Sequence, residues 1–267
     1  KGAVHQTHRF LQVQDLALFD MVTHERVLGV RSGWRTVNLH YEAARRLFLE
    51  HPLDHEPFGP EDPRTAHLIL VGFDVAGWHV ALQAARIGHF ANLKPLRISV
   101  VDVCAEKKAS QFLEDYPGMR QVSVFEYFDE NHAFTRQLDR IREWTADDSS
   151  ISSIVVAQDD EWDCVKCALR NLLNINDLTS PVYVRQQQRG QLAHLLTAWQ
   201  RDDDMVPEVY PFGTLEEICT REAILSERAD RMARAIHEDY LSKAKSRKPA
   251  GHPSLAPWEK LHPSKRN

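Results

Sequence analysis

A glycine-containing turn holds the residues whose types and spacing most clearly suggest chemistry. The segment GFDVAG, residues 72–77, follows the apolar run LILV. Gly72 permits a sharp turn out of a strand, and Gly77 lets the following helix approach a sheet closely. The free N–H groups at the start of such a helix, together with the helix dipole, favour an anion. The turn therefore has the form of a site for a phosphate group.

Asp74 departs from that form. It stands where dinucleotide-binding turns usually have a glycine that lets the pyrophosphate approach the backbone. A carboxylate at this point repels a phosphate by about 1–4 kcal/mol at a separation of about 4 Å, depending on the local dielectric. A bound phosphate would then be displaced, or a cation would have to bridge the two groups. Alternatively, Asp74 caps the helix by accepting hydrogen bonds from its free N–H groups. We interpret the site as modified rather than lost.

Three further side chains are candidates for the same site. Asp102 ends the stretch RISVVD, at close to the spacing at which an acid accepts hydrogen bonds from ribose hydroxyls, or it is a surface acid at a strand end. Asp160 follows SIVVA and either faces a ligand or caps the next helix. Arg185 ends PVYVR and either neutralises a phosphate or an acid such as Asp74, or forms a salt bridge within the fold. The candidate binding set is Gly72, Asp74, Gly77, Asp102, Asp160 and Arg185.

No catalytic or metal-binding residues are expected. Cys164 and Cys167 form a lone CxxC inside a helical pattern, whereas a zinc site needs a second pair or histidines at ligand spacing. We expect both cysteines to lie in the core. The sequence also has no nucleophile elbow and no phosphate loop that ends in Gly-Lys-Ser or Gly-Lys-Thr.

The elements that must position these residues alternate along the chain. Short apolar runs predict buried strands, and the segments between them have helical periodicity. Strands are predicted at 68–73, 97–103, 121–125, 153–157, 181–185 and 206–210, and helices at 75–89, 106–116, 131–144, 161–173 and 191–200. This alternation predicts an α/β fold with a doubly wound parallel sheet of the Rossmann type. Right-handed crossovers then bring the candidate residues to the carboxyl edge of the sheet.

Three regions are expected along the chain. Residues 1–66 form an N-terminal extension with a helix at 41–50 and a linker rich in proline and charge, which places a boundary near Thr65. Residues 67–212 form the α/β domain. Residues 213–267 form a small helical region, with a long helix at 214–245 that is broken near Thr220, and a basic tail.

Composition limits the class of protein. The formal net charge of -5 implies no general affinity for nucleic acid. The apolar runs are far shorter than a membrane span, and no secretory signal is present at the start. The 4 cysteines do not form a disulfide framework, so we expect a reducing cytoplasm. Because the chain begins with Lys1 rather than methionine, we expect a fragment or a processed chain.

The stretch from His67 to about Tyr210 resembles the Rossmann-type domain of Trk-type potassium-uptake regulators, the RCK (TrkA-N) domain. The matching pieces are HLILVGFDVAGWHVA, RISVVDV, SIVVAQDDE and PVYVRQQQ. The resemblance implies a cytoplasmic regulatory domain that binds NAD, ATP or a related adenine nucleotide and catalyses nothing. It also implies a homodimer or higher oligomer that controls ion transport, such as a potassium channel. Asp74 departs from the family pattern.

The end of the chain resembles the first half of a ryanodine-receptor repeat, the RyR domain. The matching pieces are ARAIHEDYL and HPSLAPWEKLHPSKRN, and the pattern is incomplete at Asn267. The resemblance implies a pocket formed by His237, Tyr240 and Trp258, with Trp258 packed on the helix that carries the other two. Some bacterial proteins join an RCK-like domain to a RyR domain behind a membrane segment. That arrangement implies a tether to the inner membrane through a segment outside this chain.

Three functions follow from these patterns. The first is a ligand-sensing regulatory protein that binds a nucleotide-type small molecule and acts on an ion channel or transporter. The second is an interaction scaffold with a degenerate nucleotide site, for which Asp74 is the main support. The third is an NAD-dependent oxidoreductase, which is disfavoured because the last stretch of about 55 residues is too small and basic for a substrate domain.

Overall fold

The computed structural model describes residues 9–15, 18–19, 21–22, 34–129, 135–170, 178–188, 209–220, 227–244, 252 and 255–261. The chain divides into two compact units. The larger runs from Leu39 to Ile218, and the smaller combines Lys1–Asn38 with Cys219–Asn267. The helix predicted at 191–200 lies outside the described residues, as do parts of the elements predicted at 131–144, 161–173 and 206–210.

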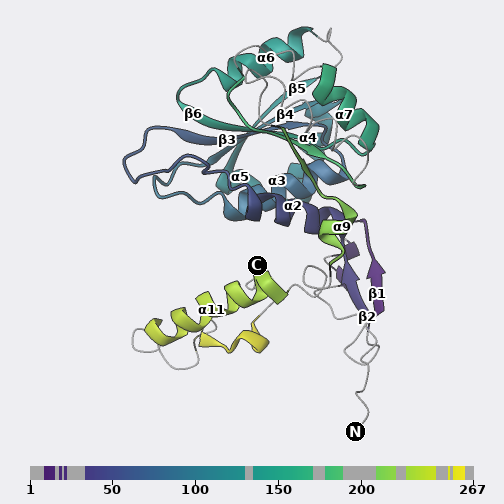
Figure 1. Cartoon of the computed structure of the whole chain (residues 1–267). Coiled ribbons are helices and arrows are strands. Elements are labelled where there is room, and N and C mark those ends of the chain that lie inside the picture. Colours follow the sequence, from purple (N-terminus) through teal and green to yellow (C-terminus); the bar gives the residue numbers. More distant parts are fainter. Residues whose placement is uncertain are drawn as a thin grey trace. The chain divides into compact units, whose positions relative to one another are not determined.

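The larger unit contains a six-stranded parallel sheet (Figure 1). Its strands are β3 (Thr65–Val71), β4 (Leu96–Asp102), β5 (Ser123–Asp129), β6 (Ser150–Val156), β7 (Val182–Arg185) and β8 (Val209–Phe212). The spatial order is β5-β4-β3-β6-β7-β8, and every neighbouring pair is parallel. This is the strand order of a doubly wound sheet, with its switch point between β3 and β6. The predicted α/β class is confirmed.

Helices cover both faces of the sheet (Figure 1). One face carries α3 (Val75–Ile87), α4 (Ala105–Asp115) and α5 (Met119–Val122), and the other carries α6 (Thr135–Thr145) and α7 (Glu161–Arg170). The connections from β3 to β4 and from β4 to β5 run in one direction across the sheet, and those from β5 to β6 and from β6 to β7 run in the other. Right-handed crossovers therefore require this division. Helix α5 was not predicted. It follows Pro117-Gly118, just after the helix predicted at 106–116, and delays the start of β5 to Ser123.

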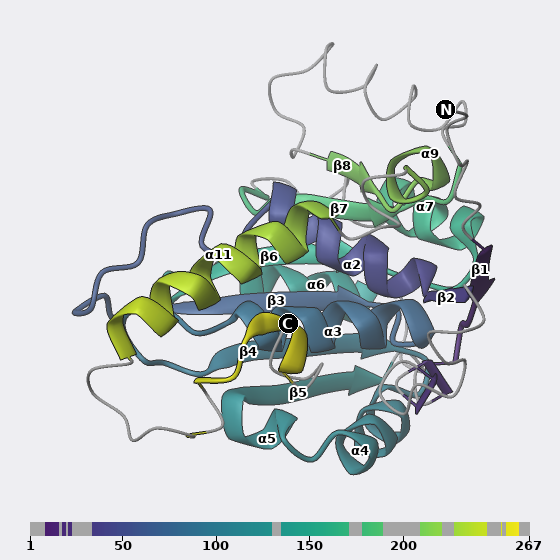
Figure 2. The ribbon, with the colours of Figure 1, turned by 90° about the horizontal axis from the view of Figure 1, so that it is seen from below.

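An additional helix, α2 (Leu39–Glu50), completes the face that carries α3. Ala43, Ala44, Leu47 and Phe48 are buried on it, in the same hydrophobic cluster as residues of β7 and β8. Figure 2 shows α2 beside α3. The predicted boundary near Thr65 therefore differs from the structure, which joins α2 and the proline-rich segment after it to the sheet. On this face the crossover helices cover the half of the sheet from β3 to β5, and α2 covers apolar surface of the other half.

Both glycines of the turn have the predicted backbone roles. Gly72 has φ +90°, and a Cβ there would lie 2.6 Å from Cγ of Gln158. A Cβ on Gly77 would lie 2.5 Å from the carbonyl oxygen of Gly72. The carbonyl group of Gly72 and the start of α3 are therefore closer together than a side chain on Gly77 would permit.

The smaller unit contains two described pieces. Strands β1 (Arg9–Gln12) and β2 (Trp34–Val37) pair in parallel. Helix α11 (Glu227–Ala244) contacts the short 3-10 helix η3 (Trp258–Lys260). Of the long helix predicted at 214–245, the described residues contain α11 and the short α9 (Leu215–Ile218), and α9 belongs to the larger unit.

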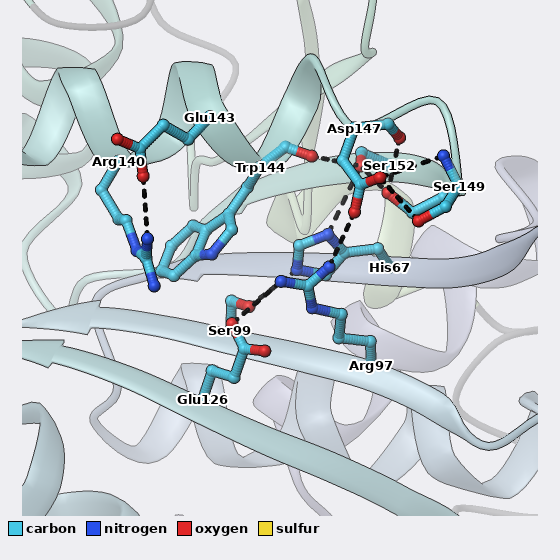
Figure 3. Close-up of polar contacts among 11 residues, drawn as sticks. His67, Arg97, Ser99, Glu126, Arg140, Glu143, Trp144, Asp147, Ser149 and Ser152 are labelled. Atoms are coloured by element: carbon cyan, nitrogen blue, oxygen red, sulfur yellow. Dashed lines mark hydrogen bonds and ion pairs between the residues drawn. The ribbon is translucent and has the colours of Figure 1, made fainter.

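A polar seam, formed by His67, Ser99 and Ser152, crosses the sheet on the face that carries α6 (Figure 3). Nε2 of His67 lies 2.7 Å from Oγ of Ser99, and its Nδ1 lies 3.5 Å from Oγ of Ser152. All three side chains are buried, and the Trp144 ring of α6 meets the His67 ring edge-on with centroids 6.0 Å apart. The sequence analysis missed the seam because its members lie one to a strand.

Arg97 of β4 forms ion pairs with two elements beside the seam (Figure 3). Its Nη2 donates to Glu126 of β5 at 3.0 Å, and its Nη1 donates to Asp147, in the turn before β6, at 3.1 Å. Burial, and secondarily the charge of Arg97, lower the pKa of His67 to about 3, with Asp147 acting in the opposite direction. His67 is therefore neutral in the folded protein at neutral pH.

Replacing His67 with glutamine tests this burial. The unfolded chain protonates this histidine at its ordinary pKa of 6.5, whereas the folded chain does so only near 3. Its contribution to stability is complete above pH 6.5 and is lost as pH falls toward the folded pKa. As the pH is lowered from about 7 to about 4, we expect the free energy of unfolding of His67→Gln to fall by less than that of the wild type. The difference between the two decreases should reach up to about 3 kcal/mol. Urea denaturation at each pH measures the difference.

His89→Gln is the matched control because His89 is exposed. Its dependence on pH should equal that of the wild type. Equal slopes for His67→Gln and the wild type would contradict the buried, neutral state of His67.

The glycine turn makes a second prediction about stability. Gly77→Ala should lower the free energy of unfolding by about 1–3 kcal/mol, because the new methyl group collides with a backbone oxygen. Gly118→Ala is the control, since a Cβ there meets nothing within 4 Å. A Gly77→Ala variant as stable as Gly118→Ala in urea denaturation would show that the turn tolerates a side chain.

Candidate functional site

The fold brings every predicted binding residue to the carboxyl edge of the sheet. Gly72 and Asp74 follow β3, Asp102 ends β4, Asp160 follows β6, and Arg185 ends β7. The edge includes the switch point between β3 and β6, the position at which doubly wound sheets bind ligands. The contacts that these residues make are directed mostly at one another and at the protein backbone.

Asp102 is buried, and the protein itself occupies both of its carboxylate oxygens. Oδ2 accepts hydrogen bonds from the N–H of Phe73 at 2.8 Å and from Nζ of Lys108 at 2.9 Å. Oδ1 accepts from the N–H of Cys104 at 3.1 Å and lies 2.8 Å from Nζ of Lys108. A ribose hydroxyl could therefore bind Asp102 only by displacing one of these donors.

Lys108, on the first turns of α4, bridges the two aspartates of the predicted site. Its Nζ lies 2.6 Å from Oδ1 of Asp74 and within 2.9 Å of both oxygens of Asp102. Burial acts to lower the pKa of Lys108, but its hydrogen bonds to Asp102 and Asp74 outweigh that effect and raise it above the ordinary value. The sequence analysis missed Lys108. The available signal was a lysine in the second turn of a helix that follows a strand-end acid.

Asp74 occupies the N-cap position of α3 but does not cap it. Its backbone is extended, as at a cap, yet its side chain makes no hydrogen bond to the helix. The carboxylate pairs with Lys108 instead. The protein therefore places a cation beside Asp74, which is what the bridging alternative predicted from the sequence would use.

Arg185 is buried and does not contact Asp74. Its Nη1 donates to the carbonyl oxygens of Gln158 at 2.9 Å and Asp159 at 3.0 Å, and its Nη2 lies 3.3 Å from Nδ1 of His40 in α2. Burial, and secondarily the charge of Arg185, lower the pKa of His40 to about 4, so His40 is neutral and can accept this hydrogen bond. Arg185 thus fixes the loop after β6 and joins it to α2 through hydrogen bonds, rather than through the salt bridge that was its alternative role.

Two neighbouring acids follow β6, and they have different surroundings. Asp160 caps α7, since its Oδ1 accepts a hydrogen bond from the N–H of Asp163 at 3.0 Å. Asp159 was not selected from the sequence, and its backbone carbonyl oxygen accepts a hydrogen bond from Arg185. Burial raises the pKa of Asp159, and the charge of Asp74 raises it further. Arg185, a backbone hydrogen bond from Ala76 in the first turn of α3, and Lys108 act in the opposite direction.

The two other residue groups singled out in the sequence have structural contacts. Cys164 and Cys167 are buried in α7, and burial raises the pKa of the Cys164 thiol to about 12. Nε2 of His237 donates to the carbonyl oxygen of Ala256 at 2.8 Å, and its ring centroid lies 6.2 Å from that of Tyr240 and 6.0 Å from that of Trp258. Trp258 therefore packs beside His237 of α11.

Comparison with known proteins found no matching family model, curated protein or solved structure. Within the described ranges, no group of three or more histidine, cysteine or acidic side chains is arranged to hold a metal ion. Among the helices that those ranges contain, none is both long and apolar enough to cross a membrane.

Lys108→Met tests the bridge. The substitution leaves the buried carboxylate of Asp102 without its cation, so we expect the free energy of unfolding to fall by about 1–3 kcal/mol, less than for a fully buried pair because Lys108 is partly exposed. Lys107→Met, at the exposed neighbouring position, should change it by less than about 0.5 kcal/mol. Equal stabilities of the two variants in urea denaturation would show that the bridge contributes nothing.

Proposed function

We propose that this chain is a ligand-sensing regulatory module that binds a nucleotide-type small molecule at the carboxyl edge of its parallel sheet and catalyses no reaction. The observation that carries the proposal is the bridge of Lys108 between Asp102 and Asp74. It joins the end of β4, the start of α3 and helix α4 at the edge where doubly wound sheets bind ligands.

The bridge supplies a way for a ligand to change the protein. Asp102 is placed to accept hydrogen bonds from ribose hydroxyls, but it does so only if Lys108 leaves it. Lys108 then becomes available to neutralise a phosphate and to offset the repulsion from Asp74. Because Lys108 belongs to α4, this exchange alters how α4 is attached to α3 and β4. A ligand that binds only the exchanged arrangement shifts the population toward it, which is what a sensor requires.

The proposed output rests on the two family resemblances. The likeness to RCK domains supports NAD or another adenine nucleotide as the ligand, and a homodimer or higher oligomer as the assembly. The likeness of the C-terminal segment to a RyR domain supports coupling to an ion channel or transporter. The contacts among His237, Tyr240 and Trp258 are compatible with such a segment.

An interaction scaffold with a degenerate nucleotide site is the second candidate. A specific observation favours it, because groups of the protein itself occupy the acceptor positions of Asp102. If these contacts never exchange, the edge serves only to hold the fold together.

A thermal-shift panel separates the two candidates. It contains NAD, NADH, ATP, ADP, ADP-ribose and cyclic nucleotides, each with and without Mg²⁺. A ligand at about 100 times its dissociation constant should stabilise the protein by about 2.7 kcal/mol, which raises the melting temperature measurably. The module should not consume the ligand. Asp102→Asn should abolish the shift, because the amide has only half of the acceptor capacity that the carboxylate offers to ribose hydroxyls.

Asp139→Asn is the control for this panel. Asp139 is exposed on α6, and its replacement removes the same charge. It should retain the full ligand-induced shift. A panel without any shift, from folded protein, would contradict sensing and favour the scaffold. Turnover of NAD or NADH would contradict a non-catalytic module.

A further inference from the structure

The two edge strands of the six-stranded sheet differ in how they are protected from pairing with another chain. Strand β8 has four residues and includes Pro211, which has no N–H group to donate. Strand β5 has seven residues, SVFEYFD, without proline, glycine or lysine. Its register with β4 is unbroken from Ser123 to Asp129, so no bulge turns it away. Among the described strands, β4 alone pairs with β5, which ends the row of strands (Figure 2).

The side chains of β5 suit the addition of a further strand. Val124 is 51% exposed and Tyr127 is 47% exposed, although both belong to residue types that favour strands. Because side chains alternate along a strand, these two lie on opposite faces of the sheet. A flat edge segment of this composition and length associates readily with another strand. The edge at β5 therefore has the properties of an interface.

The two acidic side chains of β5 do not protect this edge. Charged residues on an edge strand usually oppose pairing. Here Glu126 accepts a hydrogen bond from Nη2 of Arg97 at 3.0 Å, and Asp129 accepts one from the N–H of Glu106 in α4 at 3.1 Å. Both carboxylates are thus bound within the fold, and neither is an unpaired charge at the edge.

A second copy of β5 is complementary to this strand. In antiparallel pairing about a two-fold axis at Phe125, Val124 stands opposite the partner's Glu126 and Phe125 stands opposite the partner's Phe125. Arg97 is in register with Val124, so the partner's Glu126 approaches an arginine. An axis at Glu126 would instead place two carboxylates opposite each other, which is unfavourable. Charge complementarity therefore favours the axis at Phe125.

We infer that β5 is a dimer interface, at which two copies of the chain pair antiparallel about a two-fold axis at Phe125 and join their six-stranded sheets into one. The inference rests on the homodimer of the proposed function, but it does not require that a nucleotide binds. Backbone hydrogen bonds between the two strands and contact between the two Phe125 rings stabilise the pair.

Two substitutions at one position test the interface and its axis. Val124→Glu places two carboxylates opposite each other, whereas Val124→Lys places an ammonium group opposite the partner's Glu126. Each of these pairs occurs twice about the axis. In sedimentation equilibrium of the full chain, we expect a dimeric wild type. The dimer dissociation constant of Val124→Glu should exceed that of Val124→Lys by at least about tenfold.

A measurement on the wild type alone keeps the test decisive if either variant does not fold. Hydrogen exchange of the backbone amides at residues 123–127 should slow as the protein concentration rises through the dissociation constant. Exchange that does not depend on concentration in a dimeric protein would place the interface elsewhere.

Leu93→Glu is the matched control. Leu93 is 90% exposed in the loop between α3 and β4, so its replacement adds the same charge outside β5. Its dissociation constant should equal that of the wild type. Equal weakening by Leu93→Glu and Val124→Glu would assign the effect to net charge and overturn the inference.

The remaining outcomes separate this inference from nucleotide sensing. A wild type that is monomeric up to about 100 µM overturns the interface, whether or not nucleotides raise the melting temperature. A dimer that neither Val124 variant weakens, or that both weaken equally, overturns pairing about Phe125. If the dimer behaves as expected but no nucleotide shifts the melting temperature, the interface is supported and nucleotide sensing fails.

Discussion

The organisation of the carboxyl edge depends on one buried negative charge, that of Asp102. A carboxylate removed from water is stable only if charges and hydrogen-bond donors surround it. Here the donors are the backbone N–H groups of Phe73 and Cys104 and the ammonium group of Lys108. These contacts fix the glycine turn to β4 and hold α4 in place. They also set the direction of Lys108, which then determines the partner of Asp74.

As a consequence, the charged side chains at the carboxyl edge bind other groups of the protein. Lys108 pairs with two aspartates, and Arg185 binds backbone carbonyls and His40. The fold retains the position at which parallel sheets bind ligands, but the polar groups there contact one another. A sensor and a scaffold share this geometry. They differ in whether the internal contacts exchange with those of a ligand, which is a question of relative free energies.

Toward the amino ends of the strands, buried polar groups are also stabilised by neighbouring groups, and fewer charges take part. The seam of His67, Ser99 and Ser152 keeps a buried imidazole neutral, and the ion pairs of Arg97 lie beside it. Polar groups at both ends of the strands thus hold neighbouring elements in register. The hydrophobic clusters on the two faces supply most of the buried area between them.

The alternation of strands and helices, the parallel sheet and the roles of Gly72 and Gly77 could be predicted from the sequence. Hydrophobic periodicity and the backbone freedom of glycine are local properties, so they can be read within a few residues. The common edge of Asp74, Asp102, Asp160 and Arg185 followed from the handedness of crossovers.

Only the tertiary structure decided which groups these side chains contact. Lys108 is 34 residues from Asp74, and Arg185 is 145 residues from His40, so no local pattern pairs them. The same holds for α2, whose amphipathic face was visible in the sequence although the surface that it covers was not. Contacts between charged groups depend on distances of a few ångströms, and packing of the whole unit sets those distances.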